Sequence, residues 1–170
     1  MCYYIIIRGP LGVGKSTIAR RLAKLLSAKY ISMDLVLEKH GLDKVSHYEE
    51  CIPVKNFIKA NNIMLPEAKA KLNAGKIVVF DGCFYHRKQI QHILGSLSSL
   101  HYVFTLKAPL KVCIARDSKR KKSLGKGAAA AVHHLVSRFN YGVVIDTNKK
   151  NASQTIKEIL AYLPERINRG

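Results

Sequence analysis

The sequence is short of acidic residues, and it has no long run of apolar ones. Its 170 residues contain 11 Asp and Glu against 29 Lys and Arg, which gives a formal net charge of +18. No stretch approaches the roughly 18 consecutive apolar residues that a membrane-spanning helix needs. The apolar residues after Met1 run directly into a glycine-rich segment, so we expect no signal peptide. We therefore expect one soluble domain over residues 1–170 that does not contact membranes.

The cysteines and histidines lack the spacings of disulfide frameworks and metal centres. The four cysteines are scattered and form no C-x-x-C pair, which is typical of reduced thiols that serve in packing. His133 and His134 are adjacent and no H-E-x-x-H sequence occurs, so we expect surface or packing histidines. The reduced thiols favour a cytoplasmic protein.

The excess of positive charge has two explanations. A polyanionic partner such as a nucleic acid would use it for binding. A lysine-rich proteome or adaptation to habitat would produce the same excess without any partner. The basic residues are spread along the chain, including Lys55–Lys76, so composition leaves both explanations open.

A glycine-rich stretch near the start carries the clearest chemical signal. Tyr3–Ile7 is β-branched and aromatic, as in a buried strand, and the apolar spacing from Lys15 onward predicts a helix. Between them, "GPLGVGKST" contains the P-loop pattern G-x-x-x-x-G-K-[ST], in which backbone N–H groups and a helix N-terminus bind phosphate. We expect Lys15 to contact the β- and γ-phosphates, Ser16 to ligate Mg²⁺ and Thr17 to hold the α-phosphate. The predicted nucleotide-binding residues here are Gly9, Gly12, Val13, Gly14, Lys15, Ser16 and Thr17.

Strand and helix patterns alternate along the rest of the chain. Such alternation, with apolar strands, predicts an α/β fold in which helices cover both faces of a five-stranded parallel sheet. The expected strands are Tyr3–Ile7, Tyr30–Ser32, Lys76–Gly82, His101–Leu106 and Gly142–Asp146. The expected helices start at Lys15 or span Pro66–Ala74, Arg87–Leu97, Pro109–Arg120 and Ala128–Arg138, and a capping box at Asn151 and Gln154 begins a last helix that runs to Tyr162.

Two aspartates follow strands at the edge where parallel sheets bind ligands. Asp34 comes just after the second expected strand, and we expect it to orient and deprotonate an acceptor hydroxyl. Asp81 ends the third strand, where a P-loop protein holds the water shell of Mg²⁺. Each has a structural alternative, because aspartate also caps helices and stabilises turns.

The segment Arg116–Gly127, "RDSKRKKSLGKG", is strongly basic and interrupted by glycine. Arg116 and Arg120 are spaced i, i+4, so on a continuous helix they share a face. The segment suits a mobile lid that brings both guanidinium groups over a transferring phosphoryl group. A solvated charged loop is the alternative.

These motifs resemble those of the small P-loop kinases, a group that includes nucleotide, shikimate and gluconate kinases and the polynucleotide 5′-hydroxyl kinases. The resemblance rests on "GPLGVGKST", "SMD", "VVFDG" and "LKAPLKVCIARDSKR", and the last two look most like the polynucleotide-kinase-like or zeta-toxin-like branch. It implies a P-loop NTPase fold with strand order 2-3-1-4-5 and a short lid over about residues 116–127. It also implies Asp34 as general base or acceptor contact, Arg116 and Arg120 as lid arginines, Thr147 in a loop behind the adenine, and Arg138 as an acceptor-binding arginine.

The acceptor-binding part is expected over about residues 35–65, which carry no motif that we can interpret. Arg87, which follows His86 past the third strand, is a candidate to bind a phosphate or carboxylate of the acceptor; a helix start there would leave it solvated. The candidate substrate-binding residues are thus Asp34, Arg87 and Arg138.

The combined expectation is a kinase that uses ATP and Mg²⁺ to phosphorylate a hydroxyl or phosphate acceptor. Its expected catalytic residues are Lys15, Asp34, Arg116 and Arg120, with Ser16 and Asp81 at the metal. The acceptor is a small molecule or a polynucleotide 5′-hydroxyl, and the net charge allows nucleic-acid binding. Alternatives are a shikimate- or nucleotide-type small-molecule kinase and a nucleotide-hydrolysing nucleic-acid-binding protein. A GTPase is disfavoured because "NKKN" at residues 148–151 lacks the aspartate of N-K-x-D, and the sequence indicates no oligomeric state.

Overall fold

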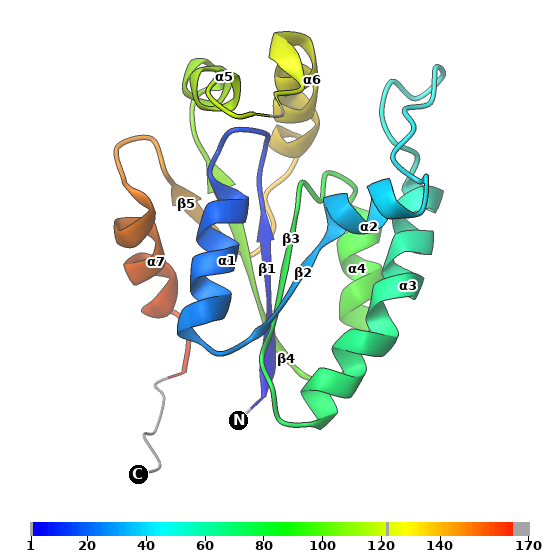
Figure 1. Cartoon of the computed structure of the whole chain (residues 1–170), viewed down its shortest axis with the longest axis vertical. Coiled ribbons are helices and arrows are strands. Elements are labelled where there is room, and N and C mark those ends of the chain that lie inside the picture. Colours follow the sequence, from blue (N-terminus) through cyan, green and yellow to red (C-terminus); the bar gives the residue numbers. More distant parts are fainter. Residues whose placement is uncertain (1, 122, 165–170) are drawn as a thin grey trace.

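Five parallel strands form a single sheet in the computed structural model, which describes residues 2–121 and 123–164 (Figure 1). Their spatial order is β2-β3-β1-β4-β5, which confirms the expected α/β fold class and the strand order that the resemblance implied. The strands are β1 (Tyr3–Arg8), β2 (Lys29–Ser32), β3 (Val78–Gly82), β4 (Leu100–Lys107) and β5 (Val143–Asp146).

The central strand β1 explains why the sheet forms around this segment. All six of its residues are buried, and its apolar side chains alternate between the two faces of the sheet. Tyr3, Ile5 and Ile7 pack into the core on one face, whereas Tyr4 and Ile6 pack into the core on the other. Since both faces are covered, a nearly continuous apolar run is what a strand at this position requires.

Helices cover both faces of the sheet (Figure 1). On one face lie α1 (Lys15–Leu25) and α7 (Ala152–Leu160), which begins at the predicted capping box of Asn151 and Gln154. On the other face lie α2 (Met33–Lys39), α3 (Val54–Asn73), α4 (Arg87–Ser96) and α6 (Gly125–Ser137). The helix α5 (Leu110–Ser118) lies at the edge of the sheet where β1 and β4 end, and it packs against α6. The carboxyl ends of the strands thus open toward α5 and α6.

The largest difference from the sequence prediction is the start of α3. The helix begins at Val54, whereas we expected it to begin at Pro66, and the proline lies inside it. Proline in a helix interior costs about 3 kcal/mol because it removes a hydrogen bond and crowds the preceding turn. Phe57, Ala60 and Met64 recur at helical spacing and are buried against the core, and this packing offsets the cost.

The region between α5 and α6 also differs from expectation. We expected one helix to extend to Arg120, but α5 ends at Ser118, and α6 begins at Gly125 rather than Ala128. The segment expected as a lid, residues 116–127, therefore contains the end of one helix, a non-helical connection and the start of the next. Lys122 lies outside the described residues.

Two simple expectations from composition can be compared with the structure. All four cysteines carry free thiols, as expected from their scattered positions. Within residues 2–121 and 123–164, no helix combines the length and the apolar character needed to cross a bilayer.

Candidate active site

The loop between β1 and α1 takes the form that its glycines allow. Gly12 has a φ of +76° and Gly14 a φ of +100°, and Gly14 is the N-cap of α1. A Cβ built on Gly12 would lie 2.0 Å from the carbonyl oxygen of Cys113 in α5. Glycine is therefore required at Gly12 both by the backbone conformation and by the close approach of a second element.

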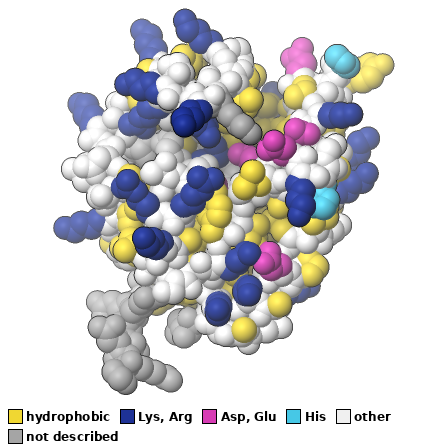
Figure 2. All heavy atoms as spheres, in the orientation of Figure 1, with side chains coloured by type: hydrophobic (Ala, Val, Ile, Leu, Met, Phe, Trp, Pro, Cys, Tyr) yellow, Lys and Arg dark blue, Asp and Glu magenta, His cyan; other side chains and the backbone are white. Residues whose placement is uncertain are grey.

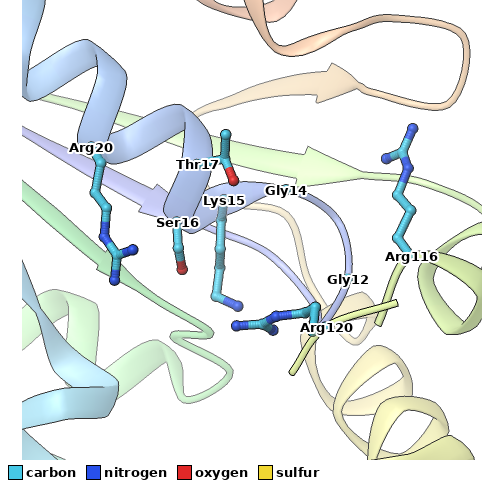
Figure 3. Close-up of a pocket in the computed structure, with 8 residues that line it drawn as sticks. All are labelled: Gly12, Gly14, Lys15, Ser16, Thr17, Arg20, Arg116 and Arg120. Atoms are coloured by element: carbon cyan, nitrogen blue, oxygen red, sulfur yellow. The ribbon is translucent and has the colours of Figure 1, made fainter. Parts of the chain in front are cut away.

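This loop borders a pocket of about 400 Å³, here called the P-loop pocket (Figure 3). Its charged lining residues are all basic, and backbone N–H groups at the start of α1 add partial positive charge. This composition suits a polyphosphate. The lining residues are Gly12, Gly14, Lys15, Ser16, Thr17, Arg20, Arg116 and Arg120.

Lys15 is almost completely buried, with 3% of its surface exposed. Burial by itself lowers the pKa of Lys15, but acidic groups around the ammonium outweigh this effect and raise the pKa above its ordinary value. The carboxylates of Asp34 and Asp81 supply this negative charge. The lysine therefore carries a full positive charge, as a phosphate ligand must.

Asp81 lies within β3 with 1% of its surface exposed. Its Oδ2 accepts a hydrogen bond from the Tyr30 hydroxyl at 2.7 Å, whereas its buried Oδ1 has no partner among the described residues. The alternative of a helix cap or turn aspartate is wrong, because the residue is in the strand and the N-cap of α4 is His86. A buried carboxylate oxygen without a partner is unfavourable unless a ligand, ion or water completes it.

Asp34 lies in the first turn of α2. The alternative of a cap is wrong here too, because the N-cap is Ser32, whose hydroxyl accepts from the Leu35 N–H at 3.4 Å. The side chain reaches solvent inside a cleft whose walls limit its hydration. This desolvation raises the pKa of Asp34; the charge of Lys15 opposes the rise and the charge of Asp81 adds to it.

Three residues that the sequence analysis missed complete this group. Arg20 lines the P-loop pocket and is spaced i, i+4 from Ser16, so the helical spacing was a usable signal. Its guanidinium lies 5.5 Å from the centre of the Tyr30 ring, and Tyr30 in turn bonds Asp81. Burial raises the pKa of Cys83 to about 12, so its thiol stays neutral beside Lys15. Its position directly after β3 was the only signal that the sequence offered.

The structure separates the two arginines that we expected on one helix face. Arg116 contacts the loop after β5, donating to the Thr147 carbonyl at 2.9 Å and to the Thr147 hydroxyl at 3.2 Å. It also reaches the Val13 carbonyl of the P-loop at 3.4 Å. Arg120 lies beyond the end of α5, points toward Lys15 and contacts Asp117 at 3.4 Å (Figure 3). Since α5 stops before Arg120, the expected shared face does not exist.

A smaller pocket of about 230 Å³, the β5 pocket, adjoins the P-loop pocket. Thr147 is buried there, and its hydroxyl donates to the Val13 carbonyl at 3.2 Å. Gly14, Thr17 and Arg116 line both pockets, so the two are continuous along the P-loop. A nucleotide whose phosphates lie in the first has room for its base in the second.

On the other side of Lys15 lies a pocket of about 560 Å³, the α2–α6 pocket. Asp34 and Cys83 lie where it approaches the P-loop, and part of the expected acceptor segment, residues 35–65, supplies one wall. The opposite wall is the apolar face of α6. The lining residues on α2 are Asp34, Leu37 and Glu38, those before α3 are Asp43, Val45, Glu50, Cys51 and Ile52, and those on α6 are Ala128, Ala131, Val132 and Leu135.

The two arginines expected to bind an acceptor are not among the residues that line this pocket. Arg87 stacks on Phe139, with its guanidinium 4.7 Å from the ring centre, and the buried Arg8 lies 4.3 Å from the same ring. Arg138 is exposed at the C-terminal end of α6. Its positive charge partly offsets the rise in the pKa of Cys51 that burial causes. Aromatic stacking on Phe139 was not visible in the spacing of these residues.

Known proteins resemble the chain over nearly its whole length. A family described as an AAA domain matches residues 5–140. A putative adenylate kinase of Pyrococcus furiosus is 29% identical over 174 residues, which cover 97% of this chain and 86% of the relative. A shikimate kinase of Actinobacillus pleuropneumoniae is 24% identical over 166 residues, which cover 96% of this chain and 95% of the relative.

Solved structures share the fold. A sugar kinase from Janibacter matches with a TM-score of 0.78 at 16% identity, over 95% of this chain and 94% of the other. The APS kinase of Mycobacterium tuberculosis, in complex with AMPPNP and APS, matches with a TM-score of 0.73 at 14% identity, over 94% of this chain and 95% of the other. The family match covers well over half of the sequence and includes the P-loop, Asp34 and Asp81. The chain therefore belongs to this AAA-domain family and is a P-loop kinase.

Proposed function

We propose that the enzyme transfers the γ-phosphoryl group of ATP to a hydroxyl of a small molecule bound in the α2–α6 pocket. The observation that carries this proposal is the position of Asp34. Its carboxylate lines the α2–α6 pocket and interacts electrostatically with Lys15 of the P-loop pocket. A hydroxyl held beside Asp34 would thus face the phosphate end of a nucleotide bound along the P-loop.

The nucleotide would occupy the two basic pockets together. The loop residues Gly12 and Gly14, with Ser16 and Thr17 at the start of α1, would surround its phosphates. Thr147 and Arg116 would adjoin its ribose and base in the β5 pocket. The adenylate kinase relative supports a purine nucleotide as donor.

The residues near Lys15 suit a magnesium ion. Mg²⁺ in phosphotransferases keeps several waters and is held through one or two protein oxygens and the substrate phosphates. The Ser16 hydroxyl in the P-loop pocket offers one such oxygen, and the unpartnered Oδ1 of Asp81, whose charge acts on Lys15, offers another. The ion, when bound, neutralises charge on the β- and γ-phosphates during transfer.

The chain's own groups would complete the transfer step. The acceptor hydroxyl oxygen bonds to the γ-phosphorus, the bond from that phosphorus to the β–γ bridging oxygen breaks, and ADP leaves. Asp34 takes the hydroxyl proton, for which its raised pKa is suited. Lys15 and Arg120, whose guanidinium points toward Lys15, stabilise the charge that develops on the phosphoryl oxygens (Figure 3).

A small acceptor fits better than a polynucleotide end. The relatives described above are named for adenylate, shikimate, sugar and APS kinases, and none of these names refers to a polynucleotide. The α2–α6 pocket has apolar walls from α3 and α6, which match a compact molecule rather than a phosphate backbone. The finer likeness to polynucleotide-kinase-like proteins therefore receives no support.

A phosphoryl-transfer screen tests this proposal. The purified chain is incubated with γ-labelled ATP and Mg²⁺ and a panel of hydroxyl compounds: sugars, amino alcohols, hydroxy acids, nucleosides and 5′-hydroxyl oligonucleotides. We expect label in a small hydroxyl compound, and its loss in Lys15→Ala. Tight ATP binding with no transfer to any class, together with hydrolysis that no acceptor stimulates, would contradict a kinase.

A further inference from the structure

The α2–α6 pocket differs in charge from the rest of the molecule. The chain carries a net charge of +18, yet the charged residues that line this pocket are Asp34, Glu38, Asp43 and Glu50. No Lys or Arg among the described residues lines it. In Figure 2, acidic side chains gather around a hollow in the face, while basic side chains are spread over most of the remaining surface. A lysine-rich proteome or adaptation to habitat would raise the charge of the whole surface and would not keep one pocket acidic.

Among the described residues, none of these four carboxylates forms a salt bridge. The ion pairs within residues 2–121 and 123–164 involve Glu67, Asp117 and Glu158, and none involves an acidic residue of the pocket. Asp34 and Glu38 are spaced i, i+4 on α2 and both line the pocket, so two like charges share one helix face. The repulsion between such a pair is unfavourable for the helix.

The basic residues near the pocket do not neutralise its acidic lining. Lys15 and Arg120 interact with Asp34 from the P-loop side, where the phosphates of ATP would take up their charge. Arg138 is close enough to Cys51 to influence its thiol, but it does not line the pocket. With ATP bound, Glu38, Asp43 and Glu50 would remain uncompensated.

The shape and lining of the pocket are a second observation. Asp34 and Cys83 line it at the end that approaches the P-loop. Toward the other end the walls are apolar, with Leu37 from α2, Phe57 from α3 and Leu135 from α6. A volume of about 560 Å³ lies in the usual range for small-molecule sites.

We infer that the acceptor is a cationic amphiphile: a molecule with an apolar body, a protonated amine and a hydroxyl. The inference rests on the proposed function and names the substrate class of the same site. Glu38, Asp43 and Glu50 bind the ammonium, the apolar walls bind the body, and the hydroxyl lies at Asp34 and becomes a phosphate monoester. Anionic acceptors, such as hydroxy acids and nucleoside monophosphates, meet like charge and are excluded.

Related hydroxyl compounds that carry a positive, a neutral or a negative group test this inference. One set is phenylalaninol, N-acetylphenylalaninol and phenyllactate; a second is glucosamine, N-acetylglucosamine and gluconate. Binding is measured by calorimetry in the presence of a non-hydrolysable ATP analogue, and transfer is measured with labelled ATP. We expect the amine of at least one set to bind at least about tenfold more tightly than its neutral analogue, which corresponds to about 1.4 kcal/mol.

A variant identifies the residues responsible. In Glu38→Gln/Asp43→Asn/Glu50→Gln we expect the KM for the amine to rise about tenfold or more, with kcat and the Kd for ATP changed less than about threefold. Glu67→Gln, which removes one carboxylate outside the pocket, is the control and leaves the preference intact. Thermal unfolding verifies that the variant folds; we expect no loss of stability, because like charges have been removed from α2.

A failure of the cationic acceptor and a failure of the proposed kinase activity give different results. If neutral or anionic hydroxyl compounds bind and accept phosphate as well as the amines in both sets, the cationic acceptor is overturned while the kinase stands. The same conclusion follows if the triple variant keeps the preference for the amine. If no compound of any charge receives phosphate although ATP binds, the proposed function itself has failed.

Discussion

At the scale of single residues, the site is a set of charges that balance one another across Lys15. The lysine is buried beside Asp34, Asp81 and the neutral thiol of Cys83, and the two carboxylates raise its pKa. Each member therefore influences the protonation of the others. Substitutions here report on chemistry and on local electrostatics at once, and they need controls that separate the two.

Lys15→Ala should lower ATP turnover by about 10²–10³-fold, because it removes a cation aimed at the charge that develops on the phosphoryl group. Steady-state kinetics measures the loss, and circular dichroism checks that the sheet remains folded. Lys24→Ala, on the exposed side of the same helix, is the matched control and should keep full turnover. Unchanged turnover in Lys15→Ala would remove the assignment of the P-loop.

Asp34→Asn should reduce transfer by about 10²-fold or more and leave the Kd for ATP nearly unchanged. The raised pKa of Asp34 has a defined sign in the pH profile: the base works only when ionised, so activity should increase as pH rises through that pKa. This acidic limb should be absent in the variant. A collapse of ATP affinity with intact transfer by the bound enzyme would instead make Asp34 a structural or metal-shell residue.

At the scale of secondary structure, the end of α5 decides what its arginines do. Because the helix stops at Ser118, Arg116 contacts Thr147 and lines both the β5 pocket and the P-loop pocket, whereas Arg120 lines only the P-loop pocket of the two. Ser123 donates to the buried Asp117 at 2.8 Å, and Asp117 also contacts Arg120, so one carboxylate organises the connection to α6. The two arginines thus share the P-loop pocket but are held by different contacts, Arg116 by Thr147 and Arg120 by Asp117.

This division predicts different kinetic effects. Arg116→Ala should mainly raise the KM for ATP, because it removes contacts that brace the nucleotide side through Thr147. Arg120→Ala should mainly lower kcat, because its charge acts on the transition state. Initial-rate kinetics of the two variants distinguishes them, and identical effects on both parameters would contradict the division.

The secondary structure also shows what sequence patterns can and cannot predict. The P-loop, the strands and the capping box of α7 depend on local residue types and were predictable. The start of α3 was not, because the burial of Phe57 and Met64 overrides the effect of Pro66. The acidic lining of the α2–α6 pocket was also hidden, because Asp34, Asp43 and Glu50 alternate with Lys39 and Lys44 in the sequence, and only the folded chain shows which side chains line the pocket.

At the scale of the whole molecule, net charge and local charge point to different ligands. The positive charge of the surface favours non-specific contact with nucleic acid, whereas the α2–α6 pocket is acidic. Binding of a polyanion would therefore be possible on the outside without access for its end to Asp34. Charge counted over the sequence says little about the substrate of such a protein.

The basic surface and the acidic pocket predict that oligonucleotides of different lengths will bind without being phosphorylated. Oligonucleotides with a 5′-hydroxyl should bind with a log affinity that falls with log salt, at a slope near −0.7 for each phosphate contacted. They should nevertheless receive no labelled phosphate, at any length, over a range of salt and pH. Transfer that improves with oligonucleotide length would restore a polynucleotide acceptor.

The absence of a side chain at Gly12 lets the P-loop and α5 pack directly against each other. The backbone of Cys113 occupies the space where a Cβ would be, and Arg116 bonds the Val13 carbonyl from the same helix. The loop and α5 are thus fastened together at two points and should shift as one rigid piece. A change that displaces α5 should therefore displace the backbone of the P-loop with it.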